Sequence, residues 1–450
     1  MMKGGKMDYS SEYKEKLRTP EEAVKVVKSG DWIDYSANYG FPILLDQALA
    51  KRKDELEDVK IRGLLSNGPI HVVEEDPARE HFTYNAWHMV SYERKLCDKG
   101  LCSFIPMLFR NLPDYYERYL TVNVAMMSVP PMDRHGYFNF SVNNACAKAV
   151  LDKADIVILE VNEHLPKVQG IDNNIHISDV DMIVEGHHEP MLEIPPSIPG
   201  ELDKKIASMI VPKIRNGSTI QLGVGAMPDA IGGMIAESDL KDLGVHSELL
   251  VNSFYEMHRA GKLNNSGKSF LKGKSVFGLG YGDQRLYDWM DENPSMYTAP
   301  MSFVNDPKVI AEIDNFVSIN SCISVDLYGQ ISAESAGHRQ ISGTGGQLDF
   351  LTGAFDNPSA QSFICMTSTF TDKKGVVHSR IVPTLPGDIV TDPRSQAMTV
   401  VTEYGMADLA GLSVWERAEA LINIAHPDFR ESLIAGAKEL KLWRRSNKIG

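Results

Sequence analysis

The sequence predicts an α/β protein made of two similar open domains that are related by an internal duplication. Residues 20–65 carry the first sign of this, because they read in order as helix, glycine stop, strand, proline-containing turn, helix and strand. Residues 206–250 read in the same order and at nearly the same spacing. Since the repeat is far longer than those of solenoid proteins, it indicates two domains of one fold.

The interval from the glycine stop to the proline of the turn aligns the two repeats. It runs from Gly30 to Pro42 in the first and from Gly217 to Pro228 in the second, one residue shorter. In the first repeat we expect helices over residues 20–27 and 43–52, and strands over 32–36 and 59–65. In the second we expect helices over 206–214 and 230–237, and strands over 218–222 and 245–250.

A proline-rich segment, Glu193 to Pro199, separates the repeats, and its three prolines favour a stiff, extended linker. We therefore expect an N-terminal α/β domain over residues 8–195 and a C-terminal α/β domain over 196–450. Other strands are expected over 155–161, 315–325 and 362–368, with an aromatic-rich strand after a turn within 130–140, a glycine-rich turn at 341–350, and a helix over 414–424 capped by Ser413.

The composition narrows the class of protein. The 450 residues are 43% hydrophobic and 24% charged, as in globular proteins with sizeable cores, and the net charge of −14 argues against a nucleic-acid surface. Apolar runs are too short to cross a bilayer, and no signal peptide is evident. Five scattered cysteines indicate free thiols in a reducing compartment, so we expect a cytoplasmic protein. Without a C-x-x-C or H-E-x-x-H motif, no metal site is expected.

The segment from Ile220 to Leu250 contains the residues that we expect to form the functional site. A strand leads into the turn Gly223-Val224-Gly225, where glycines let backbone N–H groups approach a ligand, and a helix follows. The next strand contains Glu248. Because ligands bind at the carboxyl ends of parallel strands, we expect Glu248 close to this turn, as a carboxylate beside a set of backbone donors.

The chain resembles the acetyl-CoA hydrolase/transferase family of class I CoA-transferases, and most strongly its butyryl-CoA:acetate and 4-hydroxybutyrate CoA-transferases. The resemblance runs from about Tyr9 to Arg445. It rests on Q-L-G-V-G-A-M-P-D-A, D-L-G-V-H-S-E, S-G-T-G-G-Q-L-D-F, V-T-E-Y-G-M-A-D-L and A-H-P-D-F-R. The Arg of the family's usual L-R-G segment is replaced by Ala410.

The resemblance implies roles for individual residues. Glu248 matches the covalent nucleophile, and the Val224 and Gly346 amides with the Asn305 side chain match donors to the developing oxyanions. Coenzyme A, a substrate and not a bound cofactor, would contact a set of positions in both glycine turns: Ile220, Gln221, Leu222, Gly223, Val224, Gly225, Ile323, Ser342, Gly343, Gly345 and Gly346.

The reaction implied is transfer of CoA between short-chain carboxylic acids, butyryl-CoA and acetate giving butyrate and acetyl-CoA, through a glutamyl-CoA thioester. Two alternatives keep the same fold: a 4-hydroxybutyrate CoA-transferase and an acyl-CoA hydrolase that uses Glu248 with water. A non-catalytic CoA- or nucleotide-binding module is a further alternative. A dinucleotide dehydrogenase fits less well, because G-V-G-A-M-P lacks the third glycine. We also expect a homo-oligomer, a dimer or tetramer.

Several residues are candidates for the acyl pocket from the N-terminal domain. Residues 85–88 and 133–137 could line it, or could be structural turns. In the C-terminal domain, Glu403-Tyr404-Gly405 could help to hold CoA or shape the floor of the pocket. An apolar lining for a short alkyl tail is expected from Trp87, Met89, Tyr137, Phe138 and Met227. Arg134 is the one candidate cation for a second carboxylate. Glu334 is a rival carboxylate, expected away from a glycine turn.

Overall fold

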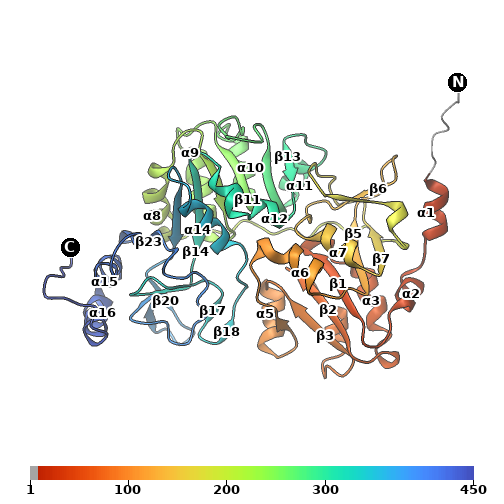
Figure 1. Cartoon of the computed structure of the whole chain (residues 1–450), viewed down its shortest axis with the longest axis horizontal. Helices are drawn as coiled ribbons and strands as arrows, with labels where there is room; N and C mark the ends of the chain where they lie inside the picture. The colour runs from red at the N-terminus through yellow and green to blue at the C-terminus, as the bar shows by residue number, and fades with distance from the viewer. Residues whose placement is uncertain (1–8) are drawn as a thin grey trace.

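Two mainly parallel sheets, one in each half of the chain, form the framework of the computed structural model, which describes residues 9–450 (Figure 1). The sheet of the N-terminal half has the strand order β4-β3-β2-β1-β5-β7-β9. Its strands are β1 (Trp32–Ala37), β2 (Val59–Leu64), β3 (Phe82–Ala86), β4 (Ser103–Phe104), β5 (Val124–Val129), β7 (Ile156–Val161) and β9 (Met182–Glu185).

The sheet of the C-terminal half has the order β13-β12-β11-β10-β14-β19-β23-β24. Its strands are β10 (Thr219–Leu222), β11 (Gly244–Val251), β12 (Ser275–Tyr281), β13 (Met296–Thr298), β14 (Phe316–Ser321), β19 (Gln361–Cys365), β23 (Thr399–Thr402) and β24 (Gly405–Asp408). All pairs are parallel except β23 with β24, an added antiparallel edge.

The two sheets match strand for strand in their order. From the first strand, each sheet grows through three successive strands on one side, β2 to β4 and β11 to β13. On the other side each adds three strands later in the chain: β5, β7 and β9 in one half, and β14, β19 and β23 in the other. The sequence prediction of two similar α/β domains is confirmed. The boundary at 195/196 remains a proposal, and the N-terminal domain's first residue, Asp8, lies outside the described residues.

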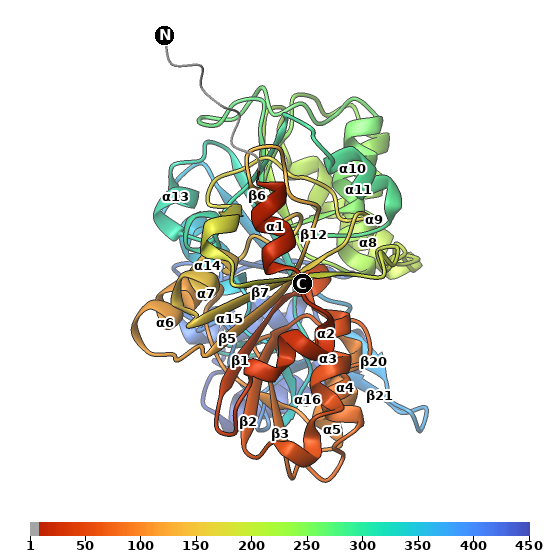
Figure 2. The same cartoon turned by 90° about the vertical axis from the view of Figure 1, so that its right-hand side faces the viewer.

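Helices cover the sheets and connect their strands. Those of the N-terminal half are α1 (Ser10–Lys16), α2 (Pro20–Ala23), α3 (Ile43–Ala50), α4 (His71–Glu74), α5 (Ser91–Asp98), α6 (Leu112–Arg118) and α7 (Ala147–Lys153). Those of the C-terminal half are α8 (Glu201–Ile210), α9 (Ala226–Glu237), α10 (Asn252–Arg259), α11 (Gln284–Met290), α12 (Met301–Val304), α13 (Pro307–Ala311), α14 (Gln347–Phe355), α15 (Val414–Asn423) and α16 (Pro427–Glu439). Figure 2 shows α1 lying across the N-terminal half, outside the sheet.

Shorter strands complete the architecture. In the N-terminal half β6 (Tyr137–Asn139) pairs with β8 (Asn174–His176). Between β14 and β23 the chain forms small sheets from β15 (Ser324–Asp326), β16 (Ile331–Ser332), β17 (Ser335–Ala336), β18 (Arg339–Gln340), β20 (Thr369–Thr371), β21 (Val377–Ser379) and β22 (Ile381–Val382). This inserted region carries the second glycine turn.

Several expected elements differ at their ends. The helix expected over 20–27 is α2 followed by a 3₁₀ turn, Val24–Val26, and the strand expected over 315–325 is two strands, β14 and β15. Helix α9 begins at Ala226, two residues before Pro228, because the first turn of a helix leaves its N–H groups unpaired and so tolerates proline. The Ser413 cap is confirmed, with Glu416 completing a capping box.

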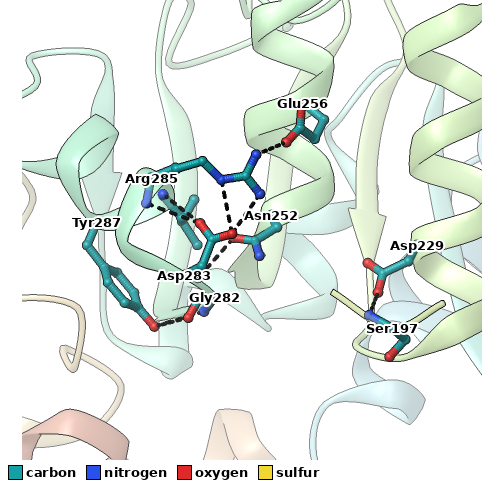
Figure 3. A network of polar contacts seen from close by, with 9 residues as sticks. Ser197, Asp229, Asn252, Glu256, Gly282, Asp283, Arg285 and Tyr287 are labelled. Atoms are coloured by element: carbon teal, nitrogen blue, oxygen red, sulfur yellow. Dashed lines mark hydrogen bonds and ion pairs between the residues drawn. The ribbon is translucent and has the colours of Figure 1, made fainter. Parts of the chain in front are cut away.

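The two halves are packed together along an apolar interface. One cluster of buried side chains runs from Phe140 and Leu159 in the N-terminal half to Leu279 and Phe316 in the C-terminal half. Two hydrogen bonds also hold the linker. The Ile194 N–H donates to the Gly282 carbonyl (2.9 Å). The Ser197 N–H donates to Asp229 Oδ2 (2.8 Å), as Figure 3 shows. The halves therefore hold one another in a fixed relation.

In the part of the chain that is described, no helix has the length and apolarity needed to span a membrane. All five cysteines are free, as expected.

A buried ion pair fixes β1 to β2 in the N-terminal sheet. Arg62 Nη1 lies 2.6 Å from Asp34 Oδ2, and both side chains are almost fully buried. Tyr116 donates its hydroxyl to Asp34 Oδ1 (2.5 Å). Burial raises the pKa of Asp34 to about 6 although Arg62 and Tyr116 oppose that rise.

Replacing Arg62 should therefore be costly. We expect Arg62→Met to lower the free energy of unfolding at pH 8 by about 3–5 kcal/mol, because it leaves the Asp34 carboxylate buried without its cation. The loss should shrink at pH 5, where Asp34 is protonated. Urea unfolding of this variant and of Lys60→Met, a half-buried residue of the same strand, measures the difference. Equal unfolding curves for the two variants would contradict the expectation.

Candidate functional site

The tripeptide His246-Ser247-Glu248 in the middle of β11 builds the core of the site. Successive side chains alternate across a strand, so His246 and Glu248 share one face while Ser247 points to the other. Ser247 Oγ donates to the Leu222 carbonyl (3.2 Å), which ties β11 to β10 just before the first glycine turn. His246 Nε2 donates to the Val304 carbonyl (2.7 Å), since a carbonyl oxygen can only accept. The strand thus holds the end of helix α12, directly before Asn305.

Asn305 lies directly over the Glu248 carboxylate. It caps the C-terminus of α12, with its backbone N–H donating to the Met301 carbonyl (2.9 Å). Its fully buried side chain donates from Nδ2 to Glu248 Oε2 at 2.7 Å. The residue that sequence matching selected as an oxyanion donor is therefore aimed at the oxygen of the expected nucleophile.

Gly346 lies beside the hydrogen bond between Asn305 and Glu248. A Cβ built on Gly346 would lie 2.2 Å from Glu248 Oε2 and 2.0 Å from Asn305 Nδ2, far inside van der Waals contact. Only glycine allows its backbone to come this close, and the Gly346 N–H is one of the groups that favour the ionised Glu248. Gly346 also precedes α14, so the positive end of that helix faces the same carboxylate.

The electrostatics of the site favour a proton on Glu248. The pKa of this partly accessible carboxyl is raised to about 7, chiefly by desolvation and also by the nearby Asp349 carboxylate, while Asn305 and the Gly346 N–H act to lower it. His88 lies close by, and burial lowers its pKa to about 4, so its imidazole is neutral at pH 7. The carboxylate of Glu248 is thus weakly solvated, yet it has preorganised donors.

Contacts from both halves of the chain hold the second glycine turn, residues 341–346. The Phe109 N–H donates to the Gly345 carbonyl (3.1 Å) and Arg94 Nε to the Ile341 carbonyl (2.6 Å), both from the N-terminal half. A Cβ at Gly345 would lie 3.4 Å from His88 Cε1 and 3.8 Å from Glu248 Oε1. The segment 85–88 therefore reaches the site through its last residue.

Glu334 holds this turn and is not a free rival to Glu248. The expectation that it lies away from a glycine turn is wrong. Oε2 accepts from the Thr344 hydroxyl (3.1 Å), and Oε1 accepts from the Thr391 hydroxyl (3.2 Å). Since Glu334 is buried with both oxygens engaged, its role is to shape the turn.

The first glycine turn follows β10 beside the strand that bears Glu248. The parallel register pairs Thr219 with Gly244 and Ile220 with Val245, an offset that brings Gly223 level with Glu248. Val224 is half exposed at the tip of the turn, and Gly225 takes a positive φ of 121° at the start of α9. The expected proximity of turn and carboxylate follows from this register.

The other expected CoA positions differ in their surroundings. Ile220 and Leu222 are core side chains, and Gln221 is bound within a buried polar cluster with Ser318 and Asn320 (2.8–3.0 Å). Any contact of these three with a ligand is therefore through the backbone. Ile323 and Ser342 are partly exposed, and Gly343, Gly345 and Gly346 line the second turn.

The expected apolar lining is wrong as a set, because the structure does not bring its members together. Met89, Phe138 and Met227 belong to three different apolar clusters. Residues 133–137, including Arg134, form a turn against β8, where a Cβ at Gly136 would meet His176 and Tyr9. Side-chain type alone did not reveal which face of an element points to the cleft.

Sequence reasoning missed Arg110 and Asp349. Asp349 lies within the S-G-T-G-G-Q-L-D-F motif, three residues after Gly346, which places it in the first turn of α14 beside the site. Arg110, in the 3₁₀ turn Phe109–Asn111, follows no motif. In the described residues, no three His, Cys, Asp or Glu side chains are grouped as metal ligands.

Comparison with known proteins identifies the family of the chain. The acetyl-CoA hydrolase/transferase N-terminal domain matches residues 1–195, and the corresponding C-terminal domain matches residues 282–437. The chain is 50% identical over 446 residues to a butyryl-CoA:acetate CoA-transferase of Anaerostipes caccae, covering 98% of this chain and all of that one. It is 40% identical to a 4-hydroxybutyrate coenzyme A transferase of Clostridium kluyveri, covering 95% and 98%.

A solved structure shares the fold over almost its whole length. RipA from Yersinia pestis superimposes with a TM-score of 0.90 at 34% identity, covering 97% of this chain and all of that one. The fold, the two matched domains and these relatives together show that the chain belongs to the acetyl-CoA hydrolase/transferase family and is a CoA-transferase.

Proposed function

We propose that this CoA-transferase exchanges CoA between short-chain carboxylic acids, with butyryl-CoA as donor and acetate as acceptor, through a thioester on Glu248. The observation that carries the proposal is the contact of the partly accessible Glu248 carboxylate with the Asn305 amide, beside the backbone of Gly346. A nucleophile needs access to substrate, and a carboxylate is the group that can exchange places with a carboxylic acid in a thioester.

The steps conserve the energy of the thioester. The Glu248 carboxylate attacks the acyl-CoA carbonyl and expels the CoA thiolate, which leaves a mixed anhydride of Glu248 and the acyl group. The thiolate then attacks the glutamyl carbonyl, which forms glutamyl-CoA and releases the acyl group as its carboxylate. Acetate reverses both steps: it attacks the glutamyl thioester to form a new anhydride, and the thiolate takes the acetyl group and frees Glu248.

Each attack places negative charge on a carbonyl oxygen that needs fixed donors. Asn305 Nδ2 already lies 2.7 Å from Glu248 Oε2, the oxygen that becomes charged when the thiolate attacks the glutamyl carbonyl. The Gly346 N–H also favours the ionised form of Glu248, and we assign the Val224 N–H to the substrate carbonyl. Loss of one such donor typically costs about 2.7–4 kcal/mol of transition-state stabilisation.

The preference for monocarboxylic acids is supported by the engagement of the nearby cations. A dicarboxylate such as succinate would need an unpaired guanidinium in the cleft. Arg110 is paired with Asp349, Arg94 is bonded to the Ile341 carbonyl, and Arg134 lies on the turn against β8. The names of the two relatives point to butyrate, acetate and 4-hydroxybutyrate.

Two further parts of the proposal concern the cell and the assembly. The free thiols fit a reducing compartment, and we place the enzyme in the cytoplasm. We also propose a homo-oligomer, a dimer or tetramer. Hydrolysis of acyl-CoA through the same Glu248 is the competing activity. A transferase turns over acyl-CoA only when a second carboxylic acid is present to accept CoA, whereas a hydrolase needs only water.

Incubation with butyryl-CoA followed by borohydride should inactivate the enzyme by reducing the thioester at Glu248. Mass spectrometry should locate the reduced side chain at this residue. Glu248→Ala should show no CoA exchange, and Glu248→Asp should lose on the order of 100-fold, because the carboxylate retreats by about 1 Å. Normal exchange by Glu248→Ala would refute the assignment.

Gly346→Ala should lose about 100-fold or more in kcat while the protein keeps its fold. The added methyl would collide with Glu248 Oε2 and Asn305 Nδ2, although the backbone at Gly346, with φ −107°, suits alanine. Gly233→Ala on the exposed side of α9 is the matched control, because a Cβ there meets nothing within 4 Å. Activity of Gly346→Ala equal to that of this control would place the reaction elsewhere.

With butyryl-CoA as donor, acetate should be the best acceptor by kcat/KM, followed by propionate and 4-hydroxybutyrate. One methylene changes binding by only about 1–3 kcal/mol, so several short acids should react. Steady-state kinetics across acetate, propionate, butyrate, 4-hydroxybutyrate and succinate test this order. Succinate as the best acceptor would reveal a cation in the acyl pocket, and CoA release without any acid would favour the hydrolase.

A further inference from the structure

One ion pair at the second glycine turn connects the N-terminal half to the catalytic site. Arg110 Nη1 lies 2.5 Å from Asp349 Oδ1, and the Arg110 backbone N–H donates to Asp349 Oδ2 (3.3 Å). Asp349 is fully buried, whereas Arg110 is about one-third exposed, 31%. The neighbouring Phe109 N–H donates to the Gly345 carbonyl. The 3₁₀ turn Phe109–Asn111 therefore bonds to residues 345–349 through both its backbone and the Arg110 side chain.

The contact continues from Asp349 to the nucleophile. Asn305 donates to Glu248 Oε2, and its side chain also supports the ionised form of Asp349. The order of contacts is therefore Arg110, Asp349, Asn305 and Glu248, with Arg110 alone coming from the N-terminal half. Arg110 does not touch Glu248 in these contacts, which connect it to the nucleophile through Asp349.

We propose that Arg110 is a positioning residue: by neutralising Asp349 it keeps the Asn305 amide on Glu248 and keeps a second negative charge away from the nucleophile. This inference rests on the proposed function of Glu248. It gives the N-terminal half a part in the reaction, through the effect of Arg110 on Asp349. It also explains why a buried carboxylate occurs in the first turn of α14, so close to a residue that must itself ionise.

The charges around Glu248 come from several elements. Asp349 on α14 is the like charge, Arg110 in the turn before α6 is its counter-ion, and the neutral His88 follows β3. Behind Asp349 lies Asp392, whose pKa burial raises to about 7 and whose Oδ2 accepts from Gln347 (2.6 Å). Arg110 is therefore the cation bonded within this group of acids.

The sign of the effect follows from these charges. Removing Arg110 raises the pKa of Asp349, so the two carboxyls share one proton over a wider pH range. Where Asp349 is ionised, its uncompensated charge disfavours ionisation of Glu248 and raises the pKa of Glu248. Since the carboxylate is the attacking form, the acid limb of the kcat/KM profile moves to higher pH. Removing the Asp349 charge as well abolishes the cause, so the limb should then move to lower pH.

The test is the pH dependence of kcat/KM for butyryl-CoA with acetate from pH 5.5 to 9.5, in the wild type and four variants. The wild type should lose activity below about pH 7, following Glu248. Arg110→Met should shift this limb upward by about one unit and recover most activity at pH 9, whereas Arg110→Lys should restore the wild-type limb. Asp349→Asn and the Arg110→Met/Asp349→Asn double variant should share one limb below that of the wild type.

Borohydride labelling of the wild type separates this inference from the proposed function. Labelling at Glu248 with an unmoved limb in Arg110→Met overturns the role of Arg110 and leaves the nucleophile intact. Absence of the label overturns the nucleophile itself. An upward shift that persists in the double variant shows that Arg110 acts by another route, which also overturns the inference.

Arg118→Met, in an exposed ion pair of the adjacent α6, is the matched control and should leave the limb in place. Should Arg110→Met fail to fold, the comparison of Arg110→Lys with Asp349→Asn still decides the matter. Equal limbs in those two variants contradict the proposal.

Discussion

The desolvation of one carboxylate is the constraint on which the site depends. Glu248 occupies the middle of a central strand, where surrounding protein removes water and raises its pKa to about 7. A carboxylate in water is a poor nucleophile because its lone pairs are solvated, whereas here two fixed donors replace that solvation only in part. The features around it, the H-S-E alternation, the Gly346 backbone and the Asn305 cap, keep those donors in place without filling the space of the substrate.

The internal duplication explains how two separate sheets meet at this carboxylate. Both sheets grow outward from a first strand in the same order, so each presents its strand ends and following loops at one edge. The C-terminal half supplies the nucleophile and both glycine turns. The loops after β3 and β4 of the other sheet supply His88, Phe109 and Arg110, which contact the second turn. The two copies of the fold have thus diverged into a reacting half and a supporting half.

Local patterns in the sequence were enough to predict the repeated framework, whereas the role of Glu248 as nucleophile came from the family resemblance and stays a prediction. Glycine stops and prolines mark the ends of elements, and the H-S-E motif carries its own geometry, because alternation sets His246 and Glu248 on one face. The same patterns gave no information on which side of a loop faces the cleft. Met89 and Phe138 were expected in the acyl pocket for their apolar character, but apolar side chains of that size are also what a core requires. The role of Arg110 could not be predicted from the sequence, because its partner Asp349 is more than two hundred positions away in the chain. Only the packing of the two halves brings the two side chains together.

The buried acids of this site lower the stability of the folded enzyme. Glu248, Asp349 and Asp392 each have a pKa raised to about 7, so each binds a proton more readily in the folded chain than in the unfolded one. By linkage, these three groups weaken the fold as pH rises from about 4 to 7, because the folded chain must then hold charges that it solvates poorly. The apolar cluster that runs through both halves offsets this cost and fixes the halves in register. A rigid, shared core is therefore what allows several buried acids to be placed so close to one reactive carboxylate.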